Sequence, residues 1–358
     1  MPPESFDRRR IKFNPLRDRR NKVAIEADHV PAAARPVALS HAAEAVVRET
    51  AARMVQARES DAACMLTFGA HTIKNGLAPV LIKLLEEGWI THLATNGAGI
   101  IHDWEFAHLG ESSEDVRENL AAGRFGAWEE TGYFLNLALA LGAYDGLGYG
   151  ASVGRLIEEE RLVMPERAAL LAATADGAAA DLREKLDAFE IKPGMIIIPH
   201  PFKRYSVQAA AYRAGVPFTG HPMIGHDIIY EHPMSCGAAI GRTAERDFLR
   251  FATSVSKLSG GAYISLGSAV MSPMIFEKAL SMARNVAHQN GQSIDDTFIA
   301  VVDIASSDWD WSQGEPPEDN PAYYQRYNKT FARAGGDLRV ATADNRDFLT
   351  ALLHALAS

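Results

Sequence analysis

The segment from Thr91 to Asp103, THLATNGAGIIHD, decides the fold class of this chain. Its apolar run stops in a glycine-containing loop at Asn96 to Gly99 and restarts as Ile100-Ile101-His102-Asp103. Open α/β sheets hold nucleotides where a strand breaks into small residues, because backbone amides there can approach a phosphate or a ribose. The segment therefore indicates a nucleotide-binding type of loop at the carboxyl end of a strand.

The neighbouring residues place that loop in a sheet. Ala63 to Phe68 is another apolar run, followed by the small residues Gly69-Ala70-His71 and by a helical stretch over 73–87. This order of elements requires parallel strands joined by right-handed crossovers. The alternation continues along the chain, with strands expected over 195–198, 216–219, 262–266, 297–304 and 337–341, and helices over 42–58, 114–141, 168–189, 206–213, 244–258, 274–288 and 344–357.

This alternation predicts an α/β fold with a doubly wound, mostly parallel, Rossmann-like sheet. The fully apolar run 195–198 is typical of a buried parallel strand. Gly142 to Gly154 is rich in glycine but follows no strand, so we interpret it as a hinge or packing turn rather than a phosphate cradle. We expect a single domain over 41–358, preceded by a basic N-terminal arm over 1–40.

Composition and charge restrict the function. The 358 residues are 47% hydrophobic and 23% charged, as in a globular protein with a large core. The net charge of -9 argues against a nucleic-acid binder and suits a cationic small-molecule substrate. The basic run from Asp7 to Lys22, DRRRIKFNPLRDRRNK, is more typical of an arm that docks on the protein's own oligomer than of an RNA-binding segment.

Cysteine usage and hydropathy bear on location. Cys64 and Cys236 support neither a disulfide framework nor a cysteine metal site. The sequence shows no signal peptide and no apolar stretch long enough to cross a bilayer. We therefore expect a cytoplasmic protein with no membrane partner.

Small or polar residues follow several of the expected strands. Because the carboxyl ends of parallel strands share one edge of the sheet, these loops would converge on a single crevice that binds a nucleotide. The alternative is that strand-to-helix turns simply favour Gly, Ser, Asn and Asp as turn and cap residues. The loops are Gly69-Ala70-His71, Asn96-Gly97-Ala98-Gly99, Gly267-Ser268-Ala269, Ala305-Ser306-Ser307 and Asp344.

Histidines gather between His200 and His232. His221 and His226 flank a Pro-Met-Ile-Gly turn and Asp227 follows, so a zinc or iron site is one interpretation. The spacing matches no common metal motif, and we expect no metal. Asp227 can instead hold a cationic substrate or a ribose hydroxyl.

The stretch from Ser306 to Thr330, SSDWDWSQGEPPEDNPAYYQRYNKT, combines acids with aromatic rings and includes Lys329 near its end. Carboxylates neutralise an alkylammonium and aromatic faces hold its charge, while a desolvated lysine can lose its proton and attack an imine. Polyamine chemistry would require this combination. The alternative is a solvated acidic loop with an ordinary exposed lysine.

These motifs resemble those of the deoxyhypusine synthase family from about Cys64 to Leu353. LTFGAHTIKNGLAP is similar to the family's first nucleotide loop, and LATNGAGIIHD to its Thr-Ala-Gly-Gly turn with a trailing acid. GHPMIGHDII is similar to its Leu-Gly-Asp-Met-Ile segment, and LGSAVMSPMIFEKALSMARN to its glycine loop and following helix. RYNK is similar to its Trp-Gly-Lys, and VATADN to the cofactor loop that closes the fold.

The resemblance implies NAD as cofactor, a polyamine such as spermidine as substrate, and a homotetramer with sites between subunits. By this resemblance Lys329 would form the imine that carries an aminobutyl group, and Asp227 would be the second catalytic residue, an acid that binds the substrate. The implied substrate contacts are His102, Glu318 and Tyr327. The implied cofactor contacts are His71, Thr72, Thr95, Asn96, Gly97, Asp103, Gly267, Ser268, Ala305 and Asp344.

The chain also departs from the family pattern. Ser272-Pro273-Met274 stands where the family carries a histidine that assists proton transfer. Tyr327 replaces the tryptophan before the lysine, Asn328 replaces the intervening glycine, and His102 replaces a glutamate. The proton-transfer and polyamine contacts therefore differ from those of the family.

The leading hypothesis is an NAD-dependent aminobutyl transferase that acts on a polyamine through a lysine imine. The acceptor would be a protein lysine, as in deoxyhypusine formation, or a free diamine, giving homospermidine. One alternative is a protein that binds NAD or a related nucleotide without this activity. Another is a metal-dependent hydrolase built on His221, His226 and Asp227.

Overall fold

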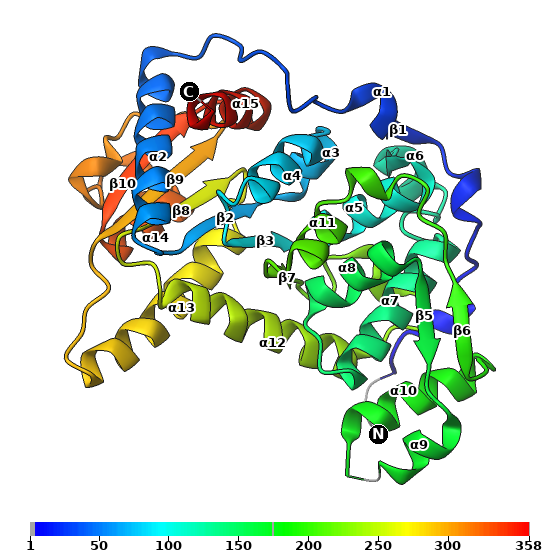
Figure 1. Ribbon diagram of the computed structural model, residues 1–358. Helices are drawn as coiled ribbons and strands as arrows, with labels where there is room; N and C mark the ends of the chain where they lie inside the picture. The colour runs from blue at the N-terminus through cyan, green and yellow to red at the C-terminus, as the bar shows by residue number, and fades with distance from the viewer. Residues whose placement is uncertain (1–3, 174, 358) are drawn as a thin grey trace.

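Six parallel strands form the central sheet within residues 4–173 and 175–357, the part of the chain that the computed structural model describes. Their order across the sheet is β10-β9-β8-β2-β3-β7, and helices cover both faces (Figure 1). This arrangement confirms the predicted α/β fold with a doubly wound parallel sheet. The strands are β2 (Cys64–Phe68), β3 (His92–Asn96), β7 (Phe218–His221), β8 (Gly261–Leu266), β9 (Thr297–Asp303) and β10 (Asp337–Thr342).

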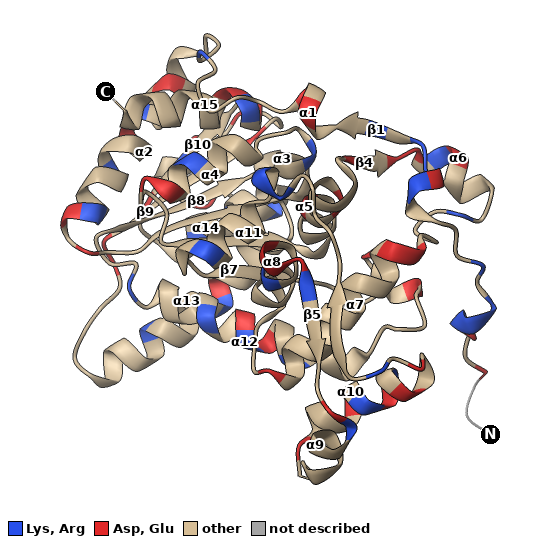
Figure 2. Ribbon diagram, turned by 45° about the vertical axis from the view of Figure 1, so that its right-hand side comes forward, with Lys and Arg blue, Asp and Glu red and all other residues tan. Residues whose placement is uncertain are grey.

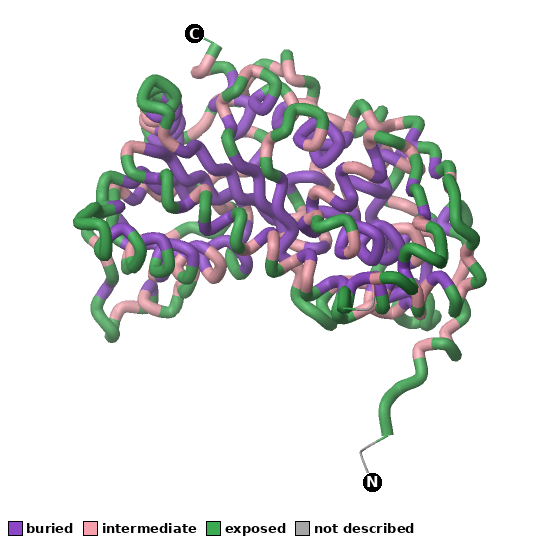
Figure 3. The backbone as a smooth tube through the Cα atoms, turned by 60° about the horizontal axis from the view of Figure 1, so that its bottom comes forward, coloured by how far each residue is buried: buried purple, intermediate pink, exposed green. Residues whose placement is uncertain are grey.

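Each strand buries side chains on both faces of the sheet. In β9, Phe298, Ala300 and Val302 belong to one hydrophobic cluster, whereas Ile299 and Val301 belong to the other. Figure 3 shows these strands as the buried centre of the molecule. The first face is covered by α2 (His41–Glu59), α4 (Ala78–Glu86), α11 (Val207–Ala214) and α15 (Asn345–Leu356), and the second by α12 (Gly237–Val255), α13 (Met271–Gln289) and α14 (Arg326–Ala334).

The opening segment of the chain forms a strand and a helix with almost no loop between them. The expected loop at Asn96 to Gly99 is instead the first turn of α5 (Gly97–Leu109). The Asn96 side chain caps this helix by accepting a hydrogen bond from Gly99 N at 2.9 Å. The apolar restart at Ile100 is therefore the buried face of a helix.

Further helices and short strands lie beyond the β3 and β7 side of the sheet. Their bounds are α3 (Ala70–Lys74), α6 (Val116–Ala121), α7 (Glu129–Tyr144), α8 (Tyr149–Glu159), α9 (Arg167–Ala172), α10 (Gly177–Ala188), β4 (Glu111–Glu114), β5 (Arg161–Met164) and β6 (Gly194–Ile197). Short 3-10 helices are η1 (Arg8–Arg10), η2 (Leu16–Asp18), η3 (Lys203–Tyr205), η4 (Ile228–Glu231), η5 (Trp311–Gln313) and η6 (Pro321–Tyr324).

The prediction of a buried parallel strand over 195–198 was wrong. This run forms β6, which pairs antiparallel with β5 outside the central sheet. Met195 is 57% exposed and Ile197 is 63% exposed, and only Ile198 is buried. A short apolar run does not reveal its hydrogen-bonding partner, and here the partner is a short strand far from the sheet.

The glycine-rich stretch from Gly142 to Gly154 is mostly helical rather than a loop. It contains the end of α7 and the start of α8, so only the residues between Tyr144 and Tyr149 form a turn. Among the described residues, no helix has both the length and the apolar character needed to span a bilayer.

The N-terminal segment packs onto the domain instead of extending from it. β1 (Asn21–Ala24) pairs antiparallel with β4, and α1 (Ile25–Asp28) follows directly. Leu16 and Ile25 are fully buried. Figure 1 shows the segment, in blue, running beside the α5 and α6 region before it crosses to α2, and Figure 2 shows basic and acidic residues interspersed along the fold.

Candidate functional site

The strand order reverses between β2 and β8, which defines the switch point of the sheet. From β2 the chain moves to β3 and β7, and it later returns through β8 to β9 and β10. Ligands of doubly wound sheets bind outside the carboxyl ends of the strands at such a point. We therefore expect the loops that follow β2 and β8 to border a ligand-binding site.

Two glycines bring these loops into contact. A Cβ atom on Gly69 would lie 2.2 Å from the carbonyl oxygen of Gly267. Gly267 itself has φ +52, and a Cβ there would meet the Asn345 side chain at 2.7 Å. Because only glycine fits at both positions, backbone rather than side chain lines the switch point.

The sequence predicted cofactor contacts along this edge, and most of those residues are at the carboxyl ends of adjacent strands. Several already have structural partners: Thr72 accepts a hydrogen bond from Asn345, Thr95 donates one to Phe68 O, and Asn96 caps α5. The predicted residues at the edge are His71, Thr72, Thr95, Asn96, Gly97, Gly267, Ser268, Ala305 and Asp344.

Asp103 is the exception. It lies inside α5, fully buried, and its carboxylate accepts hydrogen bonds from the Ser206 hydroxyl, from the backbone of Val207 and from Gln208. Burial raises its pKa despite these bonds. Asp103 thus holds the N-terminus of α11 against α5, and its position gives it no contact with the edge.

A cavity of about 250 Å³ opens at the β3 and β7 end of the edge, and we name it the acidic cavity after Glu105, Glu114 and Asp227, although Arg19, Lys22 and Lys74 also line it. It lies between α3, α5, the β4 region and the segment that leads into η4. Sequence reasoning found Asp227 and His102 of this cavity but missed its other charged residues. Its lining includes Arg19, Lys22, Lys74, Ala98, Ile101, His102, Glu105, Ser113, Glu114, Val116, Phe125, His226, Asp227 and Ile228.

Asp227 lies against the N-terminus of α5. A Cβ on Gly97 would be 2.2 Å from Asp227 Oδ2, so the carboxylate can approach the helix only because residue 97 is glycine. The Tyr230 hydroxyl donates a hydrogen bond to Oδ2 at 3.0 Å. Burial raises the pKa of Asp227 to about 6, while the helix dipole favours its charged form. A bound cation would complete the neutralisation of this carboxylate.

A buried ion pair forms the opposite wall of the acidic cavity. Arg19 contacts Glu105 with both guanidinium nitrogens, at 2.8 and 2.6 Å, and the Ser112 and Thr131 hydroxyls also donate to Glu105. Burial opposes ionisation of Glu105, but the charge and hydrogen bonds of Arg19 lower its pKa. Glu105 is thus fully engaged, and the N-terminal segment supplies a structural part of the site.

Two further carboxyl groups, those of Glu114 and Glu231, lie beside this wall, and neither forms an ion pair within the described residues. Glu114 accepts hydrogen bonds from Asn119 and from Gly126 N, and burial raises its pKa. Burial, together with the charge of Glu114, raises the pKa of Glu231 to about 7. Paired carboxyls with raised pKa values favour either a shared proton or a bound cation.

His102 and Lys74 complete the lining on the α3 side. The His102 ring is 2.7 Å from the Ser112 hydroxyl, and burial lowers its pKa to about 4, so the ring is neutral near pH 7. Lys74 makes no ion pair within the described ranges. The sequence signal for Lys74 was its place in the short helix that follows the predicted nucleotide loop, Gly69-Ala70-His71.

The acidic and aromatic stretch from Ser306 to Thr330 lies away from the acidic cavity. Lys329 lies on α14 with its Nζ 3.5 Å from the centre of the Tyr323 ring. It lines neither the acidic cavity nor an apolar cavity bounded by α12 and α13. Tyr327 is half-buried, and burial raises its pKa to about 12. Glu318 is exposed. The structure therefore does not bring Lys329 and Asp227 together within one chain.

An apolar cavity of about 690 Å³ is lined by the start of the segment that leads into η4, from His221 to Met223. Its walls come from α12, α13 and the loop after β8, and Lys278 and Arg326 are its basic residues. His221 is the imidazole that sequence reasoning had grouped with metal ligands. The lining is His221, Pro222, Met223, Ala244, Phe248, Ala269, Val270, Met271, Pro273, Met274, Ile275, Lys278, Arg326 and Thr330.

The structure separates the residues of the metal hypothesis. His221 lines the apolar cavity, whereas His226 and Asp227 line the acidic one. Within the described residues, no group of three His, Cys, Asp or Glu side chains is arranged to hold a metal ion. The arrangement gives no support to a metal-dependent hydrolase.

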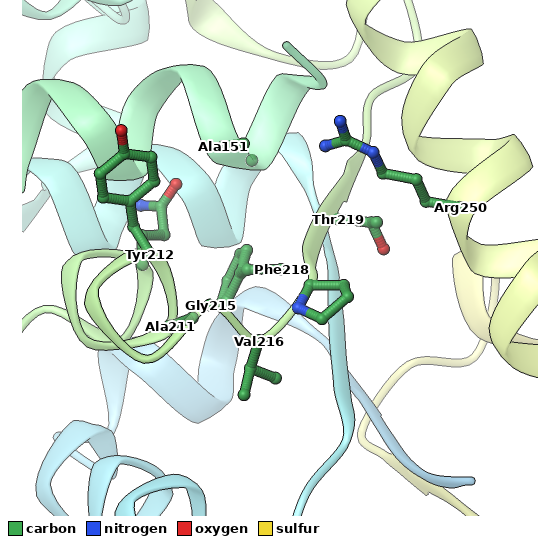
Figure 4. Close-up of a pocket in the computed structure, with 11 residues that line it drawn as sticks. Ala151, Ala211, Tyr212, Gly215, Val216, Phe218, Thr219 and Arg250 are labelled. Atoms are coloured by element: carbon green, nitrogen blue, oxygen red, sulfur yellow. The ribbon is translucent and has the colours of Figure 1, made fainter.

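A further cavity, of about 290 Å³, lies around the amino end of β7. Figure 4 shows Tyr212 and Arg250 at its borders, with Val216 and Phe218 between them. Ligands of this type of sheet bind at the opposite, carboxyl edge, so we do not assign this cavity to the site.

Comparison with known proteins finds only distant structural likenesses. No protein-family model matches the chain, and no curated protein matches it in sequence. Solved structures similar to it include apo ArgZ, an arginine dihydrolase of the ornithine-ammonia cycle in cyanobacteria, at 16% identity over 87% of this chain with a TM-score of 0.44. The complex of AgrE with ornithine and NAD+ is 16% identical over 90% of this chain with a TM-score of 0.46.

A protein from Entamoeba histolytica assigned as a deoxyhypusine synthase is 11% identical over 87% of both chains, with a TM-score of 0.42. This chain spans about a third of the length of ArgZ and AgrE, 32% and 34% respectively. At these identities and TM-scores the likenesses carry no functional conclusion for this chain.

Proposed function

We propose that this chain is an NAD-dependent enzyme that holds a cationic amine substrate in the acidic cavity. The observation that carries the proposal is Asp227, a half-buried carboxylate at the carboxyl edge of the sheet, with Tyr230 as its side-chain hydrogen-bond partner and no Lys or Arg ion-pair partner within the described residues. Glu114 and Glu231 add acidic groups nearby. An alkylammonium would neutralise these carboxyls where protein side chains do not.

NAD fits the switch point beside this cavity. Gly69 and Gly267 leave backbone at the position where a diphosphate would approach, and at the start of α13 nearby the Ser268 hydroxyl accepts a hydrogen bond from Ser272 N at 3.2 Å. Asp344, whose pKa is lowered by its hydrogen bond with Arg346, offers an acceptor for a ribose hydroxyl at the end of β10. Bound there, NAD would accept a hydride from the carbon beside the substrate nitrogen.

The finer proposal is aminobutyl transfer through a lysine imine, and two lysines compete for that role. Resemblance points to Lys329, but its Nζ lies on the face of the Tyr323 ring, outside the cavity that contains Asp227. Lys74 lines the cavity that contains Asp227. Within a single chain the geometry therefore favours Lys74 as the nucleophile, with a free diamine or a protein lysine as the acceptor.

Imine trapping separates these possibilities. Purified protein is incubated with NAD and a panel of diamines and polyamines, reduced with borohydride, and digested for mass spectrometry. We expect a covalent adduct on Lys74 that is lost in Lys74→Arg and kept in the exposed control Lys192→Arg. An adduct on Lys329 would instead place the transfer chemistry on α14. The site would then have to form between subunits, because Lys329 lies outside the cavity of Asp227 within one chain.

A second candidate function is binding of NAD or a related nucleotide without group transfer. The position of Lys329 outside both cavities favours it. It predicts NAD binding with neither NADH formation nor a trapped adduct for any amine in the panel. Turnover of a single amine would contradict it.

A further inference from the structure

His221 is the one imidazole in the lining of the apolar cavity. Its side chain is 93% buried, since the residue is 7% exposed, and its ring packs edge-on against Phe251 at 5.3 Å between centroids. Its Nε2 is 2.9 Å from the Thr219 hydroxyl. Its Nδ1 has no hydrogen-bond partner in the described part of the chain. This atom is not among the fully buried unpartnered atoms, so it is accessible from the cavity.

A chain of hydrogen bonds leads from His221 to the surface. Thr219 Oγ1 is also 2.9 Å from His92 Nε2, and His92 Nδ1 is 2.8 Å from the Ser254 hydroxyl on α12. Ser254 is partly exposed. Figure 4 shows Thr219 on β7 beside Arg250 of α12, on the side of the strand that faces this helix.

The hydroxyl of Thr219 can serve both rings. Its remaining contact is with Leu93 O at 3.5 Å, too long for a strong hydrogen bond, so its proton is available to an imidazole at 2.9 Å. With His221 protonated on Nε2 and His92 on Nδ1, every group in the chain donates to the next one. The reverse arrangement satisfies the same contacts equally well.

Neither ring can store a proton. Burial lowers the pKa of His221 to about 3, and burial together with the charge of His221 lowers that of His92 to about 3. Phe251 packs on both rings, Lys278 and Arg326 are the charged residues of the cavity, and Arg250 lies near Thr219 on α12. A proton taken up at one end of the chain must therefore leave at the other.

We propose that His221, Thr219, His92 and Ser254 form a proton relay between the apolar cavity and solvent. The proposal rests on the proposed function, because a neutral acceptor amine that reaches the imine from the apolar cavity and adds to it must release one proton. That proton binds His221 Nδ1, and the Nε2 proton moves to Thr219 Oγ1. The hydroxyl proton of Thr219 moves to His92 Nε2, the Nδ1 proton of His92 to Ser254, and the Ser254 proton to water. One proton enters, one leaves, and no group gains a net charge.

The first test does not depend on turnover. Histidine labelled with nitrogen-15 reports by NMR which ring nitrogen carries the proton. Ser254→Ala removes the acceptor of the His92 Nδ1 proton, so we expect the proton positions to reverse on His92 and also on His221, which does not touch Ser254. Unchanged ring-nitrogen shifts at His221 would overturn the relay, whatever the substrate of the enzyme is.

The second test uses turnover of whichever amine the panel identifies. Thr219→Val keeps the shape of the side chain but breaks the relay, and we expect kcat to fall about 100-fold with KM unchanged, the usual contribution of a positioned proton-transfer group. Thr219→Ser restores the hydroxyl and should recover most of kcat. Thr243→Val is the control for packing. Thr243 is also a buried threonine, but it lies on α12 and its hydroxyl donates only to backbone carbonyls.

The two tests fail in distinguishable ways. Absence of turnover in the unmodified protein would contradict the proposed function, while the NMR coupling between Ser254 and His221 would still decide the relay. Turnover of Thr219→Val equal to that of Thr243→Val would overturn the catalytic role of the relay and leave the proposed function standing.

Discussion

The acidic and the apolar cavity are lined by opposite ends of the segment from His221 to Ile228, yet they are built in opposite ways. The acidic cavity gathers charged side chains whose charges are partly neutralised by one another, as in the Arg19 and Glu105 pair. The apolar cavity is lined by methionine, phenylalanine, alanine and proline, with its cations among the exposed side chains. One segment thus contributes both to a cavity rich in charged groups and to one that is largely apolar.

This difference shows how one sheet edge can divide recognition from chemistry. A cationic nitrogen is stabilised beside Asp227, where carboxyls are close, but it would be destabilised among apolar walls next to Lys278 and Arg326. A neutral group that must lose a proton is better placed in the apolar cavity, because the single imidazole there is neutral and linked to solvent. The two cavities can therefore serve two ends of one reaction.

The largest effect is expected from breaking the buried ion pair of the acidic cavity. Arg19→Met leaves Glu105 charged and unpaired in the core, which should lower the free energy of unfolding by about 3–5 kcal/mol. Denaturant unfolding measures the change, with the exposed Arg17→Met as control. The double variant Arg19→Met with Glu105→Gln should regain part of the loss. A loss as small as that of Arg17→Met would mean that Glu105 finds another partner.

Asp227 tests charge recognition directly. Asp227→Asn keeps the shape and the Tyr230 contact but removes the charge, so the affinity for a bound diamine should fall about 100-fold. Isothermal titration with the amine identified in the panel provides the measurement, and the exposed Asp319→Asn is the control. Equal affinities for both variants would show that the amine binds elsewhere.

The pH dependence of amine binding sharpens the same point. Because burial raises the pKa of Asp227 to about 6, the carboxylate is charged above that pH and protonated below it. Affinity should therefore drop about tenfold between pH 7 and pH 5, since each unit below the pKa removes most of the remaining charged form. In Asp227→Asn, the affinity for the amine should be the same at pH 7 and at pH 5. A slope that persists would assign the titration to Glu231, whose pKa is raised to about 7.

The smallest effect is expected in the apolar cavity, where no single charge dominates. The dye 8-anilinonaphthalene-1-sulfonate, apolar with one anionic group, suits apolar walls with Lys278 and Arg326 at the border. Ala244→Leu fills part of the cavity from α12 without breaking the helix and should weaken dye binding about fivefold, or ~1 kcal/mol. Amine binding should stay unchanged. Ala180→Leu, at an exposed position of α10, is the control for fluorescence titration.

Some strands were predictable because their pattern can be read from consecutive residues. The apolar runs at Cys64 to Phe68 and Thr297 to Asp303 have the length of a strand and are buried on both faces, which is typical of parallel strands. The run over 195–198 has the same composition but a different partner. Burial of a strand depends on what packs against it, and that information is not in the run itself.

The sequence also pointed to residues of the candidate site, and their roles stay predictions. The loops after β2, β3 and β8 were chosen because strand ends carry a recognisable residue pattern, and Asp227 because it is an acid that follows Gly225-His226. Asp103 has the same appearance in the sequence as an acid that follows a nucleotide loop, but the start of α5 at Gly97 turns it toward α11. A difference of one helical turn changes which element a side chain meets.

The sequence by itself determined the parallel sheet and the edge where its loops converge, because periodicity and strand-end chemistry are properties of neighbouring residues. Only the tertiary structure decided that Arg19 of the N-terminal segment lines the acidic cavity, that Lys74 rather than Lys329 lines the cavity of Asp227, and that His221 and His92 share one hydroxyl. These relations join residues that are far apart in the chain. They arise from how the elements pack, which no local pattern specifies.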